Sequence, residues 1–167
     1  MQVLSALDYL QSRGIAHRDV RSDNLLVNRE GVVKLADFSN AVQVTQLNPM
    51  VSGAAGVVYW QAPEIRKYVF AVASSQHASA DTQRRRGTYN ALKVDVWSLG
   101  ATVWEMAEAE PPFSDVTDPR QLGSELPGLR QPEIYSRSFH DFLQLCSRPS
   151  SSRLDPHDLL NVRPARC

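Results

Sequence analysis

Two short apolar runs joined by a turn constrain the fold of this chain more than any other stretch. The runs cover residues 25–27 and 32–36, and the residues between them are turn-forming types. This pattern predicts a β-hairpin. Because a hairpin folds the chain back on itself, we expect Asn24 and Asp37 to lie side by side, although they are 13 positions apart.

The side chains at this expected meeting point suit a divalent cation. Asn24 offers an amide oxygen and Asp37 a carboxylate, and Mg²⁺ takes one or two protein oxygens, with phosphate and water completing its shell. Asp19 precedes Asn24 by five residues. It is therefore expected on the same rim, where its carboxylate could accept a proton from an incoming hydroxyl.

Three motifs follow one another in a familiar order. His-Arg-Asp-x-x-x-x-Asn covers residues 17–24, Asp-Phe-Ser residues 37–39 and Ala-Pro-Glu residues 62–64. Together they resemble the catalytic-loop, metal-loop and activation-segment signatures of eukaryotic protein kinases. The resemblance is greatest to the PAK-like branch of serine/threonine kinases, and it is carried by the stretches "HRDVRSDNLLV", "YWQAPEI" and "KVDVWSLGATVWEMAEAEPPF". The resemblance implies a kinase that uses ATP and Mg²⁺ on a protein substrate.

The resemblance also assigns a role to each site residue. Asp19 would be the base that orients the hydroxyl, and Arg21 would stabilise the transferring phosphate. Asn24 and Asp37 would hold Mg²⁺ with the nucleotide. Leu26 would form the floor under the adenine.

Further residues are expected to support the site. Asp95 would accept backbone hydrogen bonds from the catalytic loop, the alternative being a simple helix-start aspartate. Glu64 and Arg153 would form an ion pair that holds the activation segment. The remaining supporting residues are His17 and Phe38, which would pack internally, and Arg18, which would pair with an activation-loop phosphate.

The periodicity of the chain predicts a mainly α fold with one small hairpin. Residues 94–107 are apolar almost all round, which is typical of a buried central helix. Apolar residues also recur at helical spacing near the N-terminus, closed by Gly14, and over 139–146, and a last short helix starts at Pro156. Residues 41–56 show no periodicity and are expected to form an irregular activation loop, with Thr45 and Ser52 as candidate phosphorylation sites.

In terms of the kinase resemblance, residues 1–162 are expected to form the C-terminal lobe alone, with 163–167 as a tail. The 167 residues hold no glycine-rich phosphate loop, and the N-lobe is absent from them. We therefore expect little catalysis from the isolated chain. An alternative hypothesis is that the chain is truncated and has no function, and that it would aggregate through its exposed lobe interface.

Charge and cysteine content narrow the range of partners. Eighteen basic and eighteen acidic residues give no net charge, which argues against nucleic acid or an anionic membrane as the main partner. The basic run at 84–86 is expected to be a solvated loop. Cys146 lies on an apolar stripe, which indicates a buried reduced thiol in a cytosolic or nuclear protein, and we expect a cytoplasmic location. Regulation by a small GTPase would act through regions outside these residues.

Three positions depart from the family pattern. Arg21 stands where serine/threonine kinases have lysine, Ser39 where they have glycine, and Val57 where most have threonine. None of these removes the base or a metal ligand. They leave open a second hypothesis, a pseudokinase or protein-interaction module.

Residues 68–86 lie between two stretches that match the family, where the family has almost nothing. One hypothesis is that about sixteen of them, 68–83, are a translated intron, since Lys-Tyr-Val can be encoded with a splice-donor-like gtacgt. A genuine surface insertion is the alternative. The gene sequence and its spliced transcripts distinguish the two.

Overall fold

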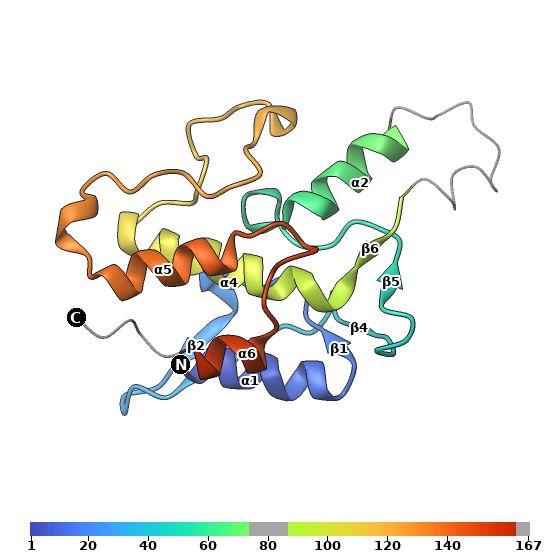
Figure 1. Cartoon of the computed structure of the whole chain (residues 1–167), viewed down its shortest axis with the longest axis horizontal. Coiled ribbons are helices and arrows are strands. Elements are labelled where there is room, and N and C mark those ends of the chain that lie inside the picture. Colours follow the sequence, from blue (N-terminus) through green and yellow to red (C-terminus); the bar gives the residue numbers. More distant parts are fainter. Residues whose placement is uncertain (74–86, 163–167) are drawn as a thin grey trace.

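A computed structural model of the protein describes residues 1–73 and 87–162 (Figure 1). Its helices are α1 (Gln2–Ser12), α2 (Pro63–Ala73), α4 (Ala91–Glu108), α5 (Arg137–Cys146) and α6 (Pro156–Asn161). Its short strands are β1 (Ile15–Ala16), β2 (Leu25–Val27), β3 (Val33–Leu35), β4 (Val42–Gln43), β5 (Met50–Val51) and β6 (Tyr89–Asn90). In the described ranges, no helix is long and apolar enough to cross a membrane.

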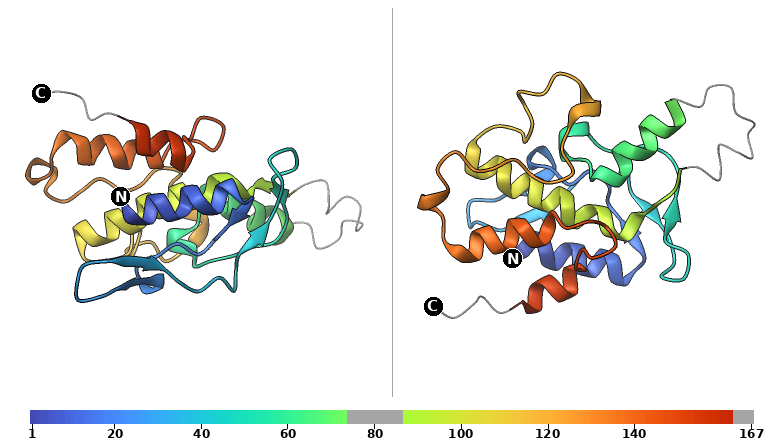
Figure 2. Two further views of the ribbon diagram at one scale, coloured as in Figure 1. Left: turned by 90° about the horizontal axis from the view of Figure 1, so that it is seen from below. Right: turned by 45° about the horizontal axis from the view of Figure 1, so that its top comes forward.

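The predicted central helix is α4, and it is buried on nearly every side. Asn90 caps its start by accepting the backbone N–H of Leu92 at 3.0 Å. The helix ends at Ala109, which has a left-handed φ of 59°. Seen from below, α1 and α4 form a middle layer, with α5 and α6 on one side and the β2–β3 hairpin on the other (Figure 2).

The N-terminal helix α1 packs through the apolar face that its sequence predicts. Leu4, Leu7 and Leu10 are buried in a core cluster shared with α4, α5 and α6. Gly14 follows the C-cap Arg13 with a φ of 69°, where a Cβ would lie 2.1 Å from the carbonyl oxygen of Val44. Glycine is needed there for both reasons.

The β-hairpin is confirmed. Strands β2 and β3 pair antiparallel, with Leu25 opposite Leu35 and Val27 opposite Val33. The backbone N–H of Ala36 donates to the carbonyl oxygen of Asn24 at 2.9 Å, which extends the pairing by one step. Asp37 therefore follows directly after the residue that is bonded to Asn24.

The expectation of an irregular segment over 41–56 needs correction. Strand β4 pairs with β1, and β5 pairs with β6, so this segment is fixed to the chain at two places. By contrast, the helical structure described over residues 114–136 consists of two 3-10 turns, η3 (Pro119–Gln121) and η4 (Pro132–Ile134).

The segment suspected to be an insertion is only partly described. Its first residues, 68–73, continue helix α2, and the ring of Tyr68 meets that of Tyr89 edge-on with centroids 6.1 Å apart. The hypothesis about 68–86 otherwise falls on residues 74–86, as does the basic run at 84–86. These residues, and the tail at 163–167, lie outside the described part of the chain.

Candidate active site

One buried carboxylate anchors the loop that carries the predicted base. Asp95 of α4 is 6% exposed, and its two oxygens accept the backbone N–H groups of His17 and Arg18 at 2.7 Å each. Burial raises the pKa of Asp95, and the two donated hydrogen bonds oppose that rise. Because α4 begins at Ala91, Asp95 does not start the helix, and the predicted anchoring contacts are present.

The anchored loop is strained at one position. Arg18 has a φ of 65°, a left-handed conformation that costs a non-glycine residue on the order of 1–2 kcal/mol. Its N–H bond to Asp95 and its side-chain contacts hold it in that conformation. Arg18 Nε donates to the carbonyl oxygen of Asn40 at 2.8 Å, and Nη1 donates to the Tyr89 hydroxyl at 3.2 Å.

His17 uses both of its ring nitrogens inside the loop. Nδ1 accepts the backbone N–H of Asp19 at 3.2 Å, so Nε2 carries the proton and donates to the carbonyl oxygen of Ala36 at 2.9 Å. The ring is fully buried and meets Phe38 edge-on, with centroids 4.8 Å apart. His17 therefore ties the loop to the end of β3, and these contacts agree with its predicted packing role.

Asp19 is a buried residue of this loop, and its two carboxylate oxygens have different surroundings. Oδ2 accepts a hydrogen bond from Asn40 Nδ2 at 3.2 Å. Oδ1 has no hydrogen-bond donor among the described residues, and the nearest cationic atom, Arg21 Nε, is 3.5 Å away. A carboxylate with one such oxygen is able to take a proton from a hydroxyl.

The two predicted metal ligands each keep one oxygen available. Asn24 Nδ2 donates to the backbone oxygen of Asp19 at 2.8 Å, which leaves its Oδ1 as an acceptor. Asp37 Oδ1 accepts the Ser39 hydroxyl at 2.6 Å and the Ser39 N–H at 3.2 Å. These bonds, the hydroxyl first, lower the pKa of Asp37 and keep it ionised, with Oδ2 left over.

This donor set fits a magnesium–nucleotide complex better than a bare ion. One amide oxygen and one carboxylate oxygen suffice for Mg²⁺ only when phosphate and water complete the shell. In the part of the chain that is described, no group of three or more His, Cys, Asp or Glu residues is arranged to hold a metal. A metal at this rim would therefore depend on the phosphates of its nucleotide.

Arg21 is held close to the predicted base. Its Nε lies 3.5 Å from Asp19 Oδ1, its Nη1 pairs with Asp23, and its guanidinium lies over the Trp60 ring at 5.9 Å. The positive charge therefore sits at the rim of the site, as its predicted role requires. The guanidinium of Arg21 also contacts the carboxylates of Asp19 and Asp23, and a phosphate would have to displace these contacts.

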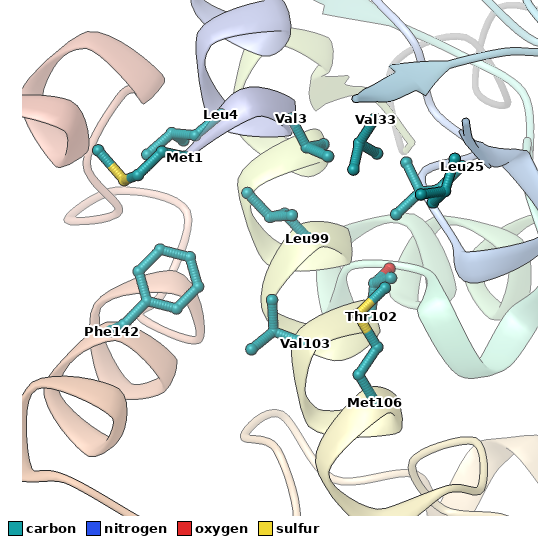
Figure 3. Close-up of a pocket in the computed structure, with 11 residues that line it drawn as sticks. Met1, Val3, Leu4, Leu25, Val33, Leu99, Thr102, Val103, Met106 and Phe142 are labelled. Carbon is teal, nitrogen blue, oxygen red and sulfur yellow. The ribbon is translucent and has the colours of Figure 1, made fainter. Parts of the chain in front are cut away.

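Leu26 faces away from an apolar cavity behind the hairpin. Side chains alternate along a strand, so Leu26, 59% exposed, lies opposite to its neighbours Leu25 and Val27. Those neighbours help to line a cavity of about 470 Å³ (Figure 3). The lining residues are Met1, Val3, Leu4, Leu25, Val27, Val33, Leu99, Thr102, Val103, Met106 and Phe142. None of their side chains is ionisable, and Leu26 is not among them, so its exposed side chain remains accessible to a base.

The predicted ion pair between the activation segment and the C-terminal region is present. Arg153 Nη1 and Nη2 donate to the two carboxylate oxygens of Glu64 at 2.6 and 3.2 Å. Arg153 also donates to the backbone oxygens of Lys93 at 2.8 Å and Arg148 at 3.0 Å. The start of α2 is thereby joined to α4 and to the segment before α6.

Two contacts at the site escaped the sequence reasoning. Glu105 accepts the Ser22 hydroxyl at 2.6 Å and the Trp60 indole N–H at 2.9 Å, so it links the catalytic loop to the activation segment. Like Asp95, it is a charged residue within the mostly apolar stretch 94–107, and that signal could have singled it out. The other contact is made by Asn40, for which the sequence holds no comparable signal.

The candidate phosphorylation sites Thr45 and Ser52 are exposed, and neither is among the hydrogen-bond partners of Arg18 described above for this structure. Thr45 Oγ1 accepts the backbone N–H of Asn48 at 3.0 Å, and Ser52 lies directly after β5. Pairing of Arg18 with a phosphate at either position stays a prediction.

Comparison with known proteins agrees with these motifs. The chain matches the family model described as "Protein kinase domain" over residues 1–163. It is 37% identical over 169 residues to serine/threonine-protein kinase pakA of Dictyostelium discoideum and 35% identical over 171 residues to serine/threonine-protein kinase PAK 1 of Mus musculus. The alignments cover 95% and 96% of this chain but only 12% and 28% of those proteins, so the chain spans a minor part of these relatives.

Proposed function

The chain belongs to the protein kinase domain family, and on this premise we propose that its site transfers the γ-phosphoryl group of ATP to a serine or threonine hydroxyl of a protein. The observation that carries the proposal is the link between Asp19 and Asn24 at the base of the hairpin. Asn24 Nδ2 bonds to the backbone of Asp19, and the backbone of Asn24 bonds to Ala36, next to Asp37. The predicted base and both predicted metal ligands are therefore held by one small unit.

The residues of the chain divide the chemistry between them. Asp19 orients the substrate hydroxyl and accepts its proton as the oxygen attacks phosphorus. Arg21 supplies positive charge to the transferring phosphoryl group. When bound, Mg²⁺ would neutralise phosphate charge, with Asn24 and Asp37 as its ligands from this chain. Leu26 provides an apolar surface for the adenine.

We also propose that these residues are the C-terminal lobe of a kinase domain, and on this basis we expect the isolated chain to turn over slowly. Positioning of the two reactants supplies most of the rate in phosphoryl transfer, and a site that lacks half of its nucleotide contacts loses that positioning. Incubation of the purified chain with labelled ATP, Mg²⁺ and a basic protein substrate tests this expectation. Robust turnover that Asp19→Asn abolishes would contradict it.

A chimera tests the proposed activity itself. In it, this chain replaces the matching segment of mouse PAK 1, so that the remainder of a kinase domain is supplied. We expect phosphorylation of serine or threonine, and we expect Asp19→Asn or Asp37→Asn to abolish it while the thermal unfolding midpoint is retained. A folded chimera without turnover would overturn the proposal.

The second candidate is a pseudokinase that binds a protein partner. The observation that favours it is the state of Arg21, which is held between Asp19 and Asp23 instead of facing open solvent. This function predicts no phosphoryl transfer in the chimera. Cytoplasmic location and regulation by a small GTPase remain predictions for either candidate.

A further inference from the structure

The side chain of Asn40 contacts the predicted base, although Asn40 takes no part in the proposed chemistry. Its Nδ2 donates to Asp19 Oδ2 at 3.2 Å. Its backbone oxygen accepts a hydrogen bond from Arg18 Nε at 2.8 Å. Residue 40 thus touches two consecutive residues of the catalytic loop, once through its side chain and once through its backbone.

The contact makes the two oxygens of Asp19 inequivalent. Oδ2 already has a donor, whereas Oδ1 is buried without one among the described residues. Arg21 Nε lies 3.5 Å from Oδ1 as an ion-pair partner but donates no hydrogen bond to it. A buried acceptor without a hydrogen bond is costly, so Oδ1 is the oxygen with most to gain from an arriving O–H group. Gly56 borders it, and a Cβ at that position would lie only 3.3 Å from Oδ1.

We propose that Asn40 is a positioning residue, which fixes the carboxylate of Asp19 and reserves Oδ1 as the oxygen that receives the substrate proton. This inference rests on the proposed function. In the step, the hydroxyl oxygen forms a bond to the γ-phosphorus, the bond from phosphorus to the ADP oxygen breaks, and the hydroxyl proton passes to Asp19 Oδ1. A carboxylate free to rotate about its Cβ–Cγ bond would present either oxygen and would lose part of this alignment.

The geometry permits a clean separation of the side-chain contact from the backbone contact. Asn40 is not among the described residues with a positive φ, so alanine fits its backbone without strain. Asn40→Ala therefore removes the amide donor to Asp19, while the backbone oxygen that accepts from Arg18 remains. Asn48→Ala is the matched control, since Asn48 is an exposed asparagine in the same segment.

A double-mutant cycle in the 167-residue chain tests the contact without any need for activity. We expect Asn40→Ala to lower the folding equilibrium constant by about tenfold or more, because a hydrogen bond to a charged group is lost. In an Asp19→Ala background the same change should have no effect. Asn48→Ala should be silent in both backgrounds. Equal effects of Asn40→Ala in the two backgrounds would overturn the proposal.

The positioning role is tested in the PAK 1 chimera. We expect Asn40→Ala to reduce kcat about tenfold with the KM values for ATP and substrate unchanged, since the aligned oxygen matters in the transition state and not in binding. An unchanged kcat, or a loss confined to KM, would overturn the role. A chimera without any turnover counts against the proposed function, and the double-mutant cycle then still decides whether Asn40 holds the carboxylate.

Discussion

Glu64→Ala should be among the most destabilising substitutions at the periphery of the site. Its partner Arg153 has a side chain only 1% exposed, whereas that of Glu64 is 17% exposed. Removal of the carboxylate leaves the guanidinium buried with bonds to two backbone oxygens and no counter-charge. Breaking a buried pair in this way costs about 3–5 kcal/mol.

Glu64→Gln should cost less, about 2 kcal/mol, because the amide oxygen keeps one of the two hydrogen bonds to Arg153. Urea unfolding, followed by tryptophan fluorescence, measures both variants. With a slope of about 2 kcal/mol per molar urea, Glu64→Ala should lower the midpoint by about 2 M and Glu64→Gln by about half as much.

The matched control is the exposed pair between Asp118 and Arg120, whose side chains are 31% and 74% exposed. Arg120→Ala removes this pair and keeps the Asp118 carboxylate that caps η3, so it should leave the midpoint unchanged within error, since exposed pairs contribute little. If Glu64→Ala shifted the midpoint no more than Arg120→Ala, the buried pair would not hold the activation segment as described.

Three further predictions concern single groups. Ser39→Ala should raise the pKa of Asp37 toward its ordinary value in a carboxyl NMR titration, and an unchanged pKa would show that the Ser39 hydroxyl does not lower it. The stabilisation of the fold by the Ser39 bonds is present above the ordinary pKa and is lost as the pH falls through the lowered pKa of the folded state. Burial raises the pKa of Cys146 to about 12, so in a Cys167→Ser background the native chain should resist maleimide at pH 8 and react on unfolding, whereas rapid native labelling would refute the burial. Asp95→Asn should reduce hydrogen-exchange protection of the two loop amides it accepts roughly tenfold, because an amide offers one oxygen in place of two, and unaltered protection would exclude the anchoring role.

Helices α1, α4, α5 and α6 and the hairpin could be predicted because their signals are local, whereas α2 (Pro63–Ala73) was not predicted. Residues 94–107 are apolar on all sides, and the structure extends this helix only to Ala91–Glu108. The hairpin follows from two strand-like runs around a turn, and its register brings Asp37 next to the residue bonded to Asn24.

The strands in the activation segment could not be predicted in the same way. Val42–Gln43 pairs with Ile15–Ala16, and Met50–Val51 pairs with Tyr89–Asn90, so each partner lies far away in the sequence. Two residues are too few to show an alternating pattern. Their pairing depends on how α1 and α4 are packed, which is a property of the whole fold.

Motif order identified the residues of the candidate site, but it could not give their contacts. The hydrogen bond from Asn40 to Asp19 forms because the chain turns back toward the catalytic loop after Asp37–Ser39. Glu105 similarly contacts Ser22 and Trp60, which precede it in the sequence by 83 and 45 positions. Such contacts appear only once the tertiary structure is known.

Paramagnetic NMR with Mn²⁺ in the presence of ATP tests the central claim most directly, because it detects weak binding by the isolated chain. The account predicts that line broadening is strongest at the amides flanking Asn24 and Asp37, that it requires the nucleotide, and that Asp37→Asn abolishes it. Broadening centred on the acidic residues Glu108 and Glu110, or no selective broadening at any concentration, would contradict a metal–nucleotide site at the base of the hairpin.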